Sequence, residues 1–81
     1  MTASQITVYT SNLCGTCQMV KAYLRLLGRE FVEKNVSSDL EGRAELVGMG
    51  YYSTPVTRIG RTTLEGFDTG RIDRALAELA E

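Results

Sequence analysis

The spacing of hydrophobic positions divides the chain into short strands and helices. Segments rich in β-branched and aromatic residues predict strands. Segments whose apolar residues recur every three or four positions predict helices. The expected strands cover 5–10, 31–36, 56–59 and 62–65, and the expected helices run from about Gly15 to Gly28, from Ser38 to Gly48, and beyond Asp68.

Each predicted helix has an apolar face that we expect to pack inward. In the first helix Gln18, Lys21 and Arg25 lie on the opposite face, toward solvent. The inward residues are Met19, Val20, Tyr23, Leu24 and Leu27 in the first helix, Leu40, Ala44 and Val47 in the second, and Ile72, Ala75, Leu76 and Leu79 in the third.

Residues with special roles at helix ends and turns mark the boundaries of these elements. Gly28 suits the position just after a helix end. Ser38 followed by Glu41 fits a capping box that would start the second helix. Gly60 and Arg61 between the last two strands suit a two-residue type II′ turn, which takes glycine first.

The element order β-α-β-α-β-β-α predicts an α/β fold. The first β-α-β unit implies a parallel strand pair with a right-handed crossover. The late hairpin adds antiparallel strands, so the simplest packing is a four-stranded mixed sheet with helices on both faces. The length of 81 residues suffices for a single domain, 1–81.

The overall composition excludes several classes of partner. The net charge of −1 gives no indication of nucleic-acid binding, and no apolar run approaches the roughly 18 residues of a membrane span. Residues 1–5 show no secretory signal pattern. We therefore expect a cytoplasmic monomer, in a reducing compartment where a persistent structural disulfide would be unusual.

Candidate chemistry lies in the pair Cys14 and Cys17, the only cysteines of the chain. They stand where the first strand gives way to the first helix, and the start of a helix favours a thiolate. Cys14 is the expected exposed nucleophile, and Cys17, in the first turn, is placed to resolve a mixed disulfide. The small Gly15 and Thr16 leave room for a substrate to approach.

The cysteine pair also allows other interpretations. Two ordinary buried cysteines are not typical of a helix start with small neighbours. A zinc site needs four ligands, and the chain has no histidine and no further cysteine, so a metal would need a second subunit, carboxylates or an external thiol. Thiol–disulfide exchange is the favoured chemistry, and no metal ligand is predicted.

The only proline, Pro55, opens the third strand, a position where its missing N–H does no harm. By themselves the residues leave its cis or trans state open. A strand, a helix carrying the cysteine pair, and Thr54-Pro55-Val56 further along together resemble glutaredoxin-like proteins of the thioredoxin superfamily, from Ile6 to Leu79. The resemblance implies the thioredoxin-like (glutaredoxin) fold, a cis Pro55 facing the cysteines, and pairing of the Thr54 backbone with the substrate.

Finer features resemble the NrdH-type redoxins, which supply electrons to ribonucleotide reductase. These features are the segment from Val47 to Val56 and the pair Gly66-Phe67, which with Asp68 would contact the substrate. Ser11 and Asn12 stand where glutathione-dependent glutaredoxins commonly have lysine and proline. The resemblance thus implies a thiol–disulfide oxidoreductase that reduces protein disulfides, among them that of ribonucleotide reductase.

The resemblance leaves the electron source open between two routes. One is NADPH through thioredoxin reductase, and the other is glutathione, which would make the chain a glutathione-dependent glutaredoxin able to deglutathionylate proteins. No bound cofactor is expected. A metal or iron–sulfur binding module remains a further alternative, although the small copper-chaperone domains that share a CxxC follow a different element order.

Overall fold

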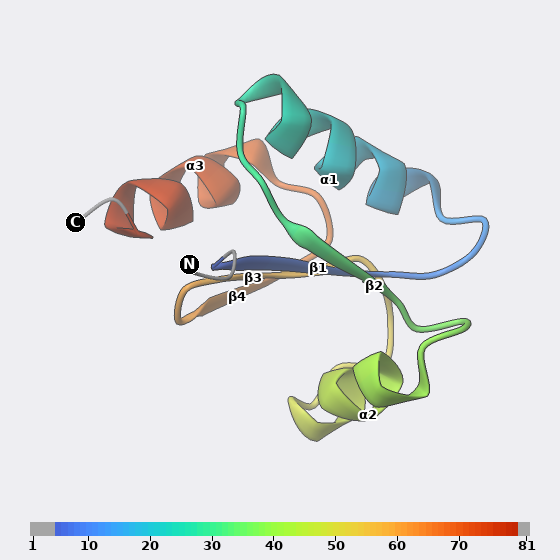
Figure 1. Ribbon diagram of the computed structural model, residues 1–81. Helices are drawn as coiled ribbons and strands as arrows, with labels where there is room; N and C mark the ends of the chain where they lie inside the picture. Colours follow the sequence, from blue (N-terminus) through green and yellow to red (C-terminus); the bar gives the residue numbers. More distant parts are fainter. Residues whose placement is uncertain (1–4, 80–81) are drawn as a thin grey trace.

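A four-stranded mixed sheet forms the centre of the computed structural model, which describes residues 5–79. The expectations for 1–4 and for the end of the 1–81 domain lie outside the described residues. The element order is the predicted one: β1 (Ile6–Thr10), α1 (Gly15–Leu26), β2 (Val32–Asn35), α2 (Leu40–Gly48), β3 (Val56–Ile59), β4 (Thr62–Glu65) and α3 (Thr69–Leu79). Helices α1 and α3 cover one face of the sheet and α2 covers the other (Figure 1).

The strands lie in the order β2-β1-β3-β4. β1 runs parallel to β2, as the α1 crossover requires, and antiparallel to β3. β3 and β4 form the predicted hairpin, in which Ile59 pairs with Thr62 and Gly60 has a positive φ of 59°. The predicted α/β fold is confirmed. The last residues of β1 and the first residues of β3 lie side by side, where Tyr9 pairs with Val56.

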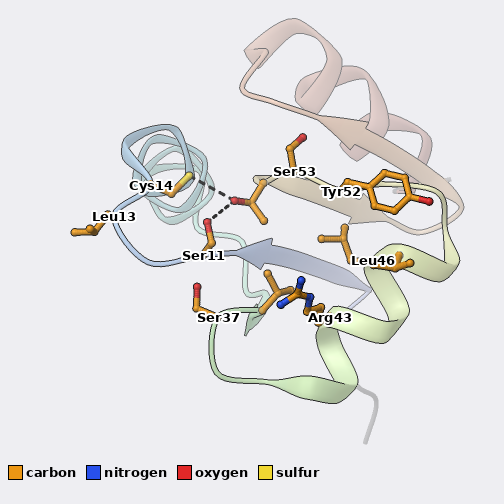
Figure 2. A pocket seen from close by; sticks show the side chains of 11 residues that line it. Ser11, Leu13, Cys14, Ser37, Arg43, Leu46, Tyr52 and Ser53 are labelled. Atoms are coloured by element: carbon orange, nitrogen blue, oxygen red, sulfur yellow. Dashed lines mark hydrogen bonds between the residues drawn. The ribbon is translucent and has the colours of Figure 1, made fainter.

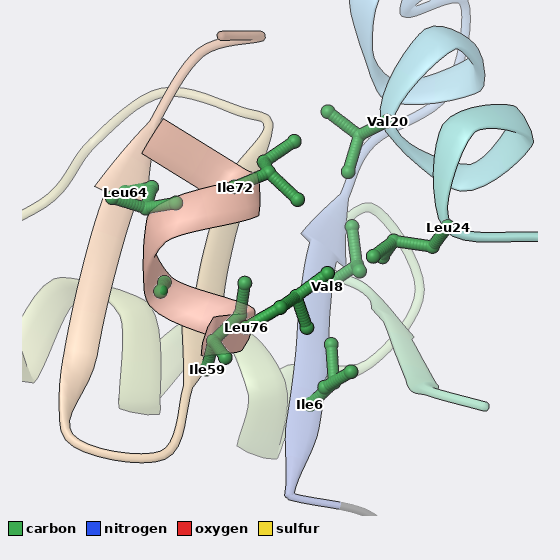
Figure 3. Packing of buried hydrophobic residues seen from close by; sticks show 9 residues of the cluster. Ile6, Val8, Val20, Leu24, Ile59, Leu64, Ile72 and Leu76 are labelled. Atoms are coloured by element: carbon green, nitrogen blue, oxygen red, sulfur yellow. The ribbon is translucent and has the colours of Figure 1, made fainter. Parts of the chain in front are cut away.

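The main core lies between the sheet and the pair of helices α1 and α3 (Figure 3). Alternate residues of β1 point into it, because successive side chains of a strand face opposite sides of the sheet. Its buried members are Ile6, Val8, Val20, Leu24, Ile59, Leu64, Ile72, Ala75 and Leu76. A smaller cluster on the α2 face contains Tyr9, Leu46 and Val56.

Two residues of helix α1 and Leu27, directly after it, differ from the predicted orientation. Met19 and Leu27 were predicted to face inward but are 48% and 42% exposed. Lys21 was predicted to face solvent but is buried, and its ammonium group lies 3.0 Å from the carboxylate of Glu33. The prediction for Lys21 was wrong because β2 places the carboxylate of Glu33 beneath α1. Pairing with this carboxylate offsets the free-energy cost of burying the lysine.

The predicted end of α1 is confirmed in detail. Gly28 follows the helix with a φ of 72°, a conformation that costs glycine nothing. Its N–H bonds to the Arg25 carbonyl, and the N–H of Arg29 bonds to the Leu24 carbonyl. These two hydrogen bonds form a Schellman motif, which satisfies the last carbonyls of the helix.

Helix α2 starts one residue later than the capping box predicts. Asp39, not Ser38, is the N-cap, and its carboxylate accepts a hydrogen bond from the N–H of Gly42 at 2.9 Å. The inward face is formed by Gly42 and Leu46.

The predicted inward residues of α2 are instead turned outward. Leu40 is 82% exposed, Val47 is 42% exposed, and Ala44 is exposed as well. The prediction was wrong because Gly42 packs closely against the side chains of Asp39 and Lys34, so the helix approaches β2 along a glycine. This close approach sets the rotation of α2 about its axis.

The two candidate caps of α2 can be separated by substitution. Asp39→Ala should lower the free energy of unfolding by about 1 kcal/mol, because it leaves an N–H of the first turn without an acceptor. Ser38→Ala should change it by no more than about 0.5 kcal/mol. Urea unfolding of the oxidised proteins measures both values, and equal losses would contradict the assignment of Asp39 as the cap.

Candidate functional site

Cys14 is the N-cap residue of α1, at the junction that the sequence predicts. Its backbone is extended, and its sulfur accepts a hydrogen bond from the N–H of Cys17 at 3.2 Å. Cys14 and Cys17 form a disulfide with their Cα atoms 5.2 Å apart, within the usual range for such a bond. The sulfur of Cys14 thus receives the N–H donation that the start of a helix offers to a thiolate.

The two sulfur-bearing residues differ in access. Cys17 is 1% exposed, whereas Cys14 is half-buried and lines an open groove. Gly15 and Thr16 between them are exposed, and the space next to the Gly15 Cα is open. This asymmetry suits a nucleophile at Cys14 and a resolving thiol at Cys17, the roles predicted from the sequence.

Hydroxyl groups lie beside the sulfur of Cys14. The Thr16 hydroxyl is 3.6 Å from it, and the Thr54 hydroxyl donates to it at 3.9 Å (Figure 2). The Ser11 hydroxyl lies 2.6 Å from that of Thr54. Because a hydroxyl has one proton, Ser11 donates to Thr54 when Thr54 donates to Cys14. The end of β1 and the loop before β3 are thereby joined at the cysteine.

The Thr54–Pro55 peptide bond is cis, as the resemblance implies. Pro55 is buried, and its carbonyl accepts a hydrogen bond from the N–H of Gly66 at 2.9 Å. Of the three predicted contact residues after β4, Gly66 is therefore the one bonded to this loop.

Phe67 and Asp68 have evident structural partners. The ring of Phe67 meets that of Tyr23 edge-on, with centroids 6.2 Å apart, and packs against the main core. The carboxylate of Asp68 accepts a hydrogen bond from the N–H of Arg71 at the start of α3. Substrate contact by Phe67 and Asp68 stays a prediction, and neither residue lines the groove beside Cys14.

Lys21, the lysine of α1, forms an ion pair with Glu33. The hydrogen bond from Lys21 holds the pKa of Glu33 below its usual value, and the Thr10 hydroxyl adds a second hydrogen bond to the same carboxylate. The ammonium group of Lys21 is thus committed to Glu33. Stabilisation of a Cys14 thiolate is therefore expected to come mainly from the helix start, as predicted from the sequence.

Two further properties concern residues 5–79 as a whole. No three histidine, cysteine, aspartate or glutamate side chains gather there in a group that could hold a metal ion. None of the helices in this part of the chain is long and apolar enough to cross a membrane.

The groove beside Cys14 includes two residues that sequence reasoning missed, Leu13 and Arg43, and one residue of the Val47 to Val56 segment singled out there, Tyr52. Leu13 is fully exposed and has a φ of 57°, a left-handed conformation that costs a leucine about 1–2 kcal/mol. Arg43 and Tyr52 reach the same groove from α2 and from the loop after it. The position of an apolar leucine directly before the first cysteine could have indicated Leu13 as a site residue. The sequence around Arg43 does not distinguish it from a solvent-exposed helix residue.

Comparison with known proteins places these features in a family. The glutaredoxin family model matches residues 6–63. A relative from Clostridium pasteurianum, described as an uncharacterized glutaredoxin-like 8.6 kDa protein in the rubredoxin operon, is 31% identical over 72 residues, which cover 88% of this chain and 96% of the relative.

Solved structures agree with this match. The NrdH-redoxin from Escherichia coli, described as a glutaredoxin-like protein, superposes with a TM-score of 0.78 and 32% identity, over 85% of this chain and 91% of that one. The thioredoxin-like protein BC3987 gives a TM-score of 0.82 and 30% identity, over 86% and 97% of the two chains. Because the family match spans both Cys14–Cys17 and Thr54–Pro55, on which the resemblance rests, the chain belongs to the glutaredoxin family of the thioredoxin superfamily.

Proposed function

We propose that the chain reduces disulfides of protein substrates by a dithiol mechanism and that it receives electrons from NADPH through thioredoxin reductase. The observation that carries the proposal is the unequal exposure of the two cysteines at the start of α1, with Cys14 facing a groove and Cys17 buried directly behind it. Such a pair combines an accessible attacking thiol with a resolving thiol that is protected from other disulfides.

The proposed cycle begins with both cysteines reduced. The Cys14 thiolate attacks one sulfur of the substrate disulfide, which forms a mixed disulfide and releases the first substrate thiolate. The Cys17 thiolate then attacks the Cys14 sulfur, which releases the second substrate thiolate and forms the Cys14–Cys17 disulfide. Two electrons from NADPH, passed through the flavin of the reductase, return the pair to two thiols.

The preference for thioredoxin reductase over glutathione rests on the residues around Cys14. Ser11, where glutathione-dependent relatives commonly have a lysine, supplies a hydroxyl bonded to Thr54 and no positive charge. The similar NrdH-redoxin from Escherichia coli is described as having a thioredoxin-like activity profile. Because the NrdH-type redoxins, which this chain resembles, supply electrons to ribonucleotide reductase, the disulfide of that enzyme is the proposed physiological substrate.

The electron source can be tested by reducing the oxidised protein in two parallel reactions. One contains NADPH and thioredoxin reductase, and the other contains NADPH, glutathione and glutathione reductase. NADPH oxidation in the presence of a protein disulfide should be rapid in the first reaction and slow in the second. Rapid turnover only with glutathione would overturn the proposed electron source and would favour a glutathione-dependent glutaredoxin.

A further inference from the structure

The groove beside Cys14 has a volume of about 600 Å³ and lies between the end of β1, helix α2 and the loop that carries Thr54. Leu13 lies next to Cys14 at one end of it, and Tyr52 lies at the other end (Figure 2). A segment of a substrate that continues from a sulfur bonded to Cys14 would enter this groove. The side chains that line it therefore bear on which disulfides the protein accepts.

In the part of the chain that the structure describes, Arg43 is the one charged residue that lines the groove. Its guanidinium reaches from α2 toward the groove, between Ser37 and Leu46 (Figure 2). Among the described residues it has no carboxylate partner, whereas the buried Lys21 pairs with Glu33. The groove thus presents an unneutralised positive charge in a fork geometry that suits a carboxylate.

The ends of the groove are apolar and exposed. Leu13 is fully exposed, and Tyr52 is 81% exposed. Leu13 also has the left-handed backbone conformation that leucine rarely adopts. Because the Leu13 side chain is fully exposed and its φ is unfavourable, folding of the described residues gains little from it. Such strain next to a reactive residue indicates a role in binding.

We propose that this groove binds the peptide segment flanking the reactive disulfide of a substrate protein and selects segments with an acidic side chain. The acidic side chain pairs with Arg43, and apolar neighbours pack against Leu13 and Tyr52. The charge of the groove argues for this occupant, because a basic segment would meet Arg43 without a compensating acid. This inference rests on the proposed function and specifies the class of protein disulfide that the site prefers.

The test uses disulfide-linked dimers of single-cysteine peptides that differ only in the residues beside the cysteine, which are glutamate in one and lysine in the other. The wild-type protein should reduce the acidic dimer with a kcat/KM about tenfold above that of the basic dimer at low ionic strength. The preference should fall as salt is added, because salt screens exposed charges. Arg43→Glu should reverse the preference, and Arg43→Lys should keep much of it.

A matched control is Arg74→Glu, which makes the same change in net charge on α3. This helix lies on the opposite face of the sheet from α2 (Figure 1), and Arg74 is exposed. Arg74→Glu should leave the ratio of the two kcat/KM values unchanged. Because the readout is a ratio within one protein, partial unfolding of a variant cannot imitate a reversal.

The outcomes separate this inference from the proposed function. If the wild-type protein reduces neither dimer, the proposed function fails. If it reduces both with equal kcat/KM, the function stands and the acidic preference is wrong. A third reaction uses oxidised glutathione as the substrate. If Arg43→Glu lowered kcat/KM for oxidised glutathione and left the values for both peptide dimers unchanged, glutathione would be the occupant of the groove and the inference would be overturned.

Discussion

Replacing Cys14 with serine is expected to lower the rate of protein-disulfide reduction at least about a thousandfold. A serine hydroxyl stays protonated near neutral pH and cannot form the mixed disulfide, so the first step of the cycle is lost. Cys17 cannot take over, because it is 1% exposed behind the start of α1. Reduction of insulin disulfides, driven by NADPH and thioredoxin reductase, measures this loss.

A suitable control is Met19→Ser, which removes another sulfur from the same helix. Met19 is 48% exposed and belongs to neither core cluster, so this variant should fold and retain its activity. Thermal unfolding of both variants checks that they are folded. If Cys14→Ser kept more than about a tenth of the wild-type rate, the assignment of Cys14 as the nucleophile would be wrong.

Replacing Cys17 with serine should have the second largest effect, and one of a different kind. Cys14 can still attack, but no internal thiol remains to release the product, so a mixed disulfide accumulates. With a disulfide-linked dimer of a single-cysteine peptide, each protein molecule should bind one peptide and release one. Mass spectrometry under non-reducing conditions measures the adduct, and alkylation of the released thiol prevents the reverse reaction.

The same variant tests the glutathione alternative. In the absence of glutathione, Cys17→Ser should not turn over repeatedly, and dithiothreitol should remove the bound peptide. Continued turnover without any added thiol would contradict the resolving role of Cys17. Efficient turnover restored by glutathione would show that glutathione can resolve the adduct and would weaken the preference for thioredoxin reductase.

Features that depend on neighbouring residues were predictable from the sequence. The end of α1 at Gly28 and the hairpin turn at Gly60 depend on backbone conformations that glycine adopts at no cost, so the residue itself marks the place. Placement of Cys14 and Cys17 at a helix start followed from the change in hydrophobic period after β1. The cis state of Pro55 followed from the family resemblance and not from the residues alone.

Features that depend on distant residues were mispredicted or missed. The helical pattern places Lys21 on the solvent face of α1. In the structure Lys21 is buried, because β2 brings Glu33 close enough to pair with it. The inward face of α2 was mispredicted because packing of Gly42 against Lys34, in β2, decides its rotation. Arg43 could not be assigned to the groove for the same reason, since this rotation decides which residues of α2 face it.

The sequence by itself determined the order of the elements, the mixed sheet and the redox-active pair, because hydrophobic period, glycine positions and cysteine spacing are local properties. The tertiary structure decided that Ser11, Thr54 and Cys14 meet, that Lys21 is committed to Glu33, and that Arg43 stands in the groove with no acidic partner among residues 5–79. These relations join residues far apart in the chain, and they exist only once sheet register and helix rotation have been set by packing.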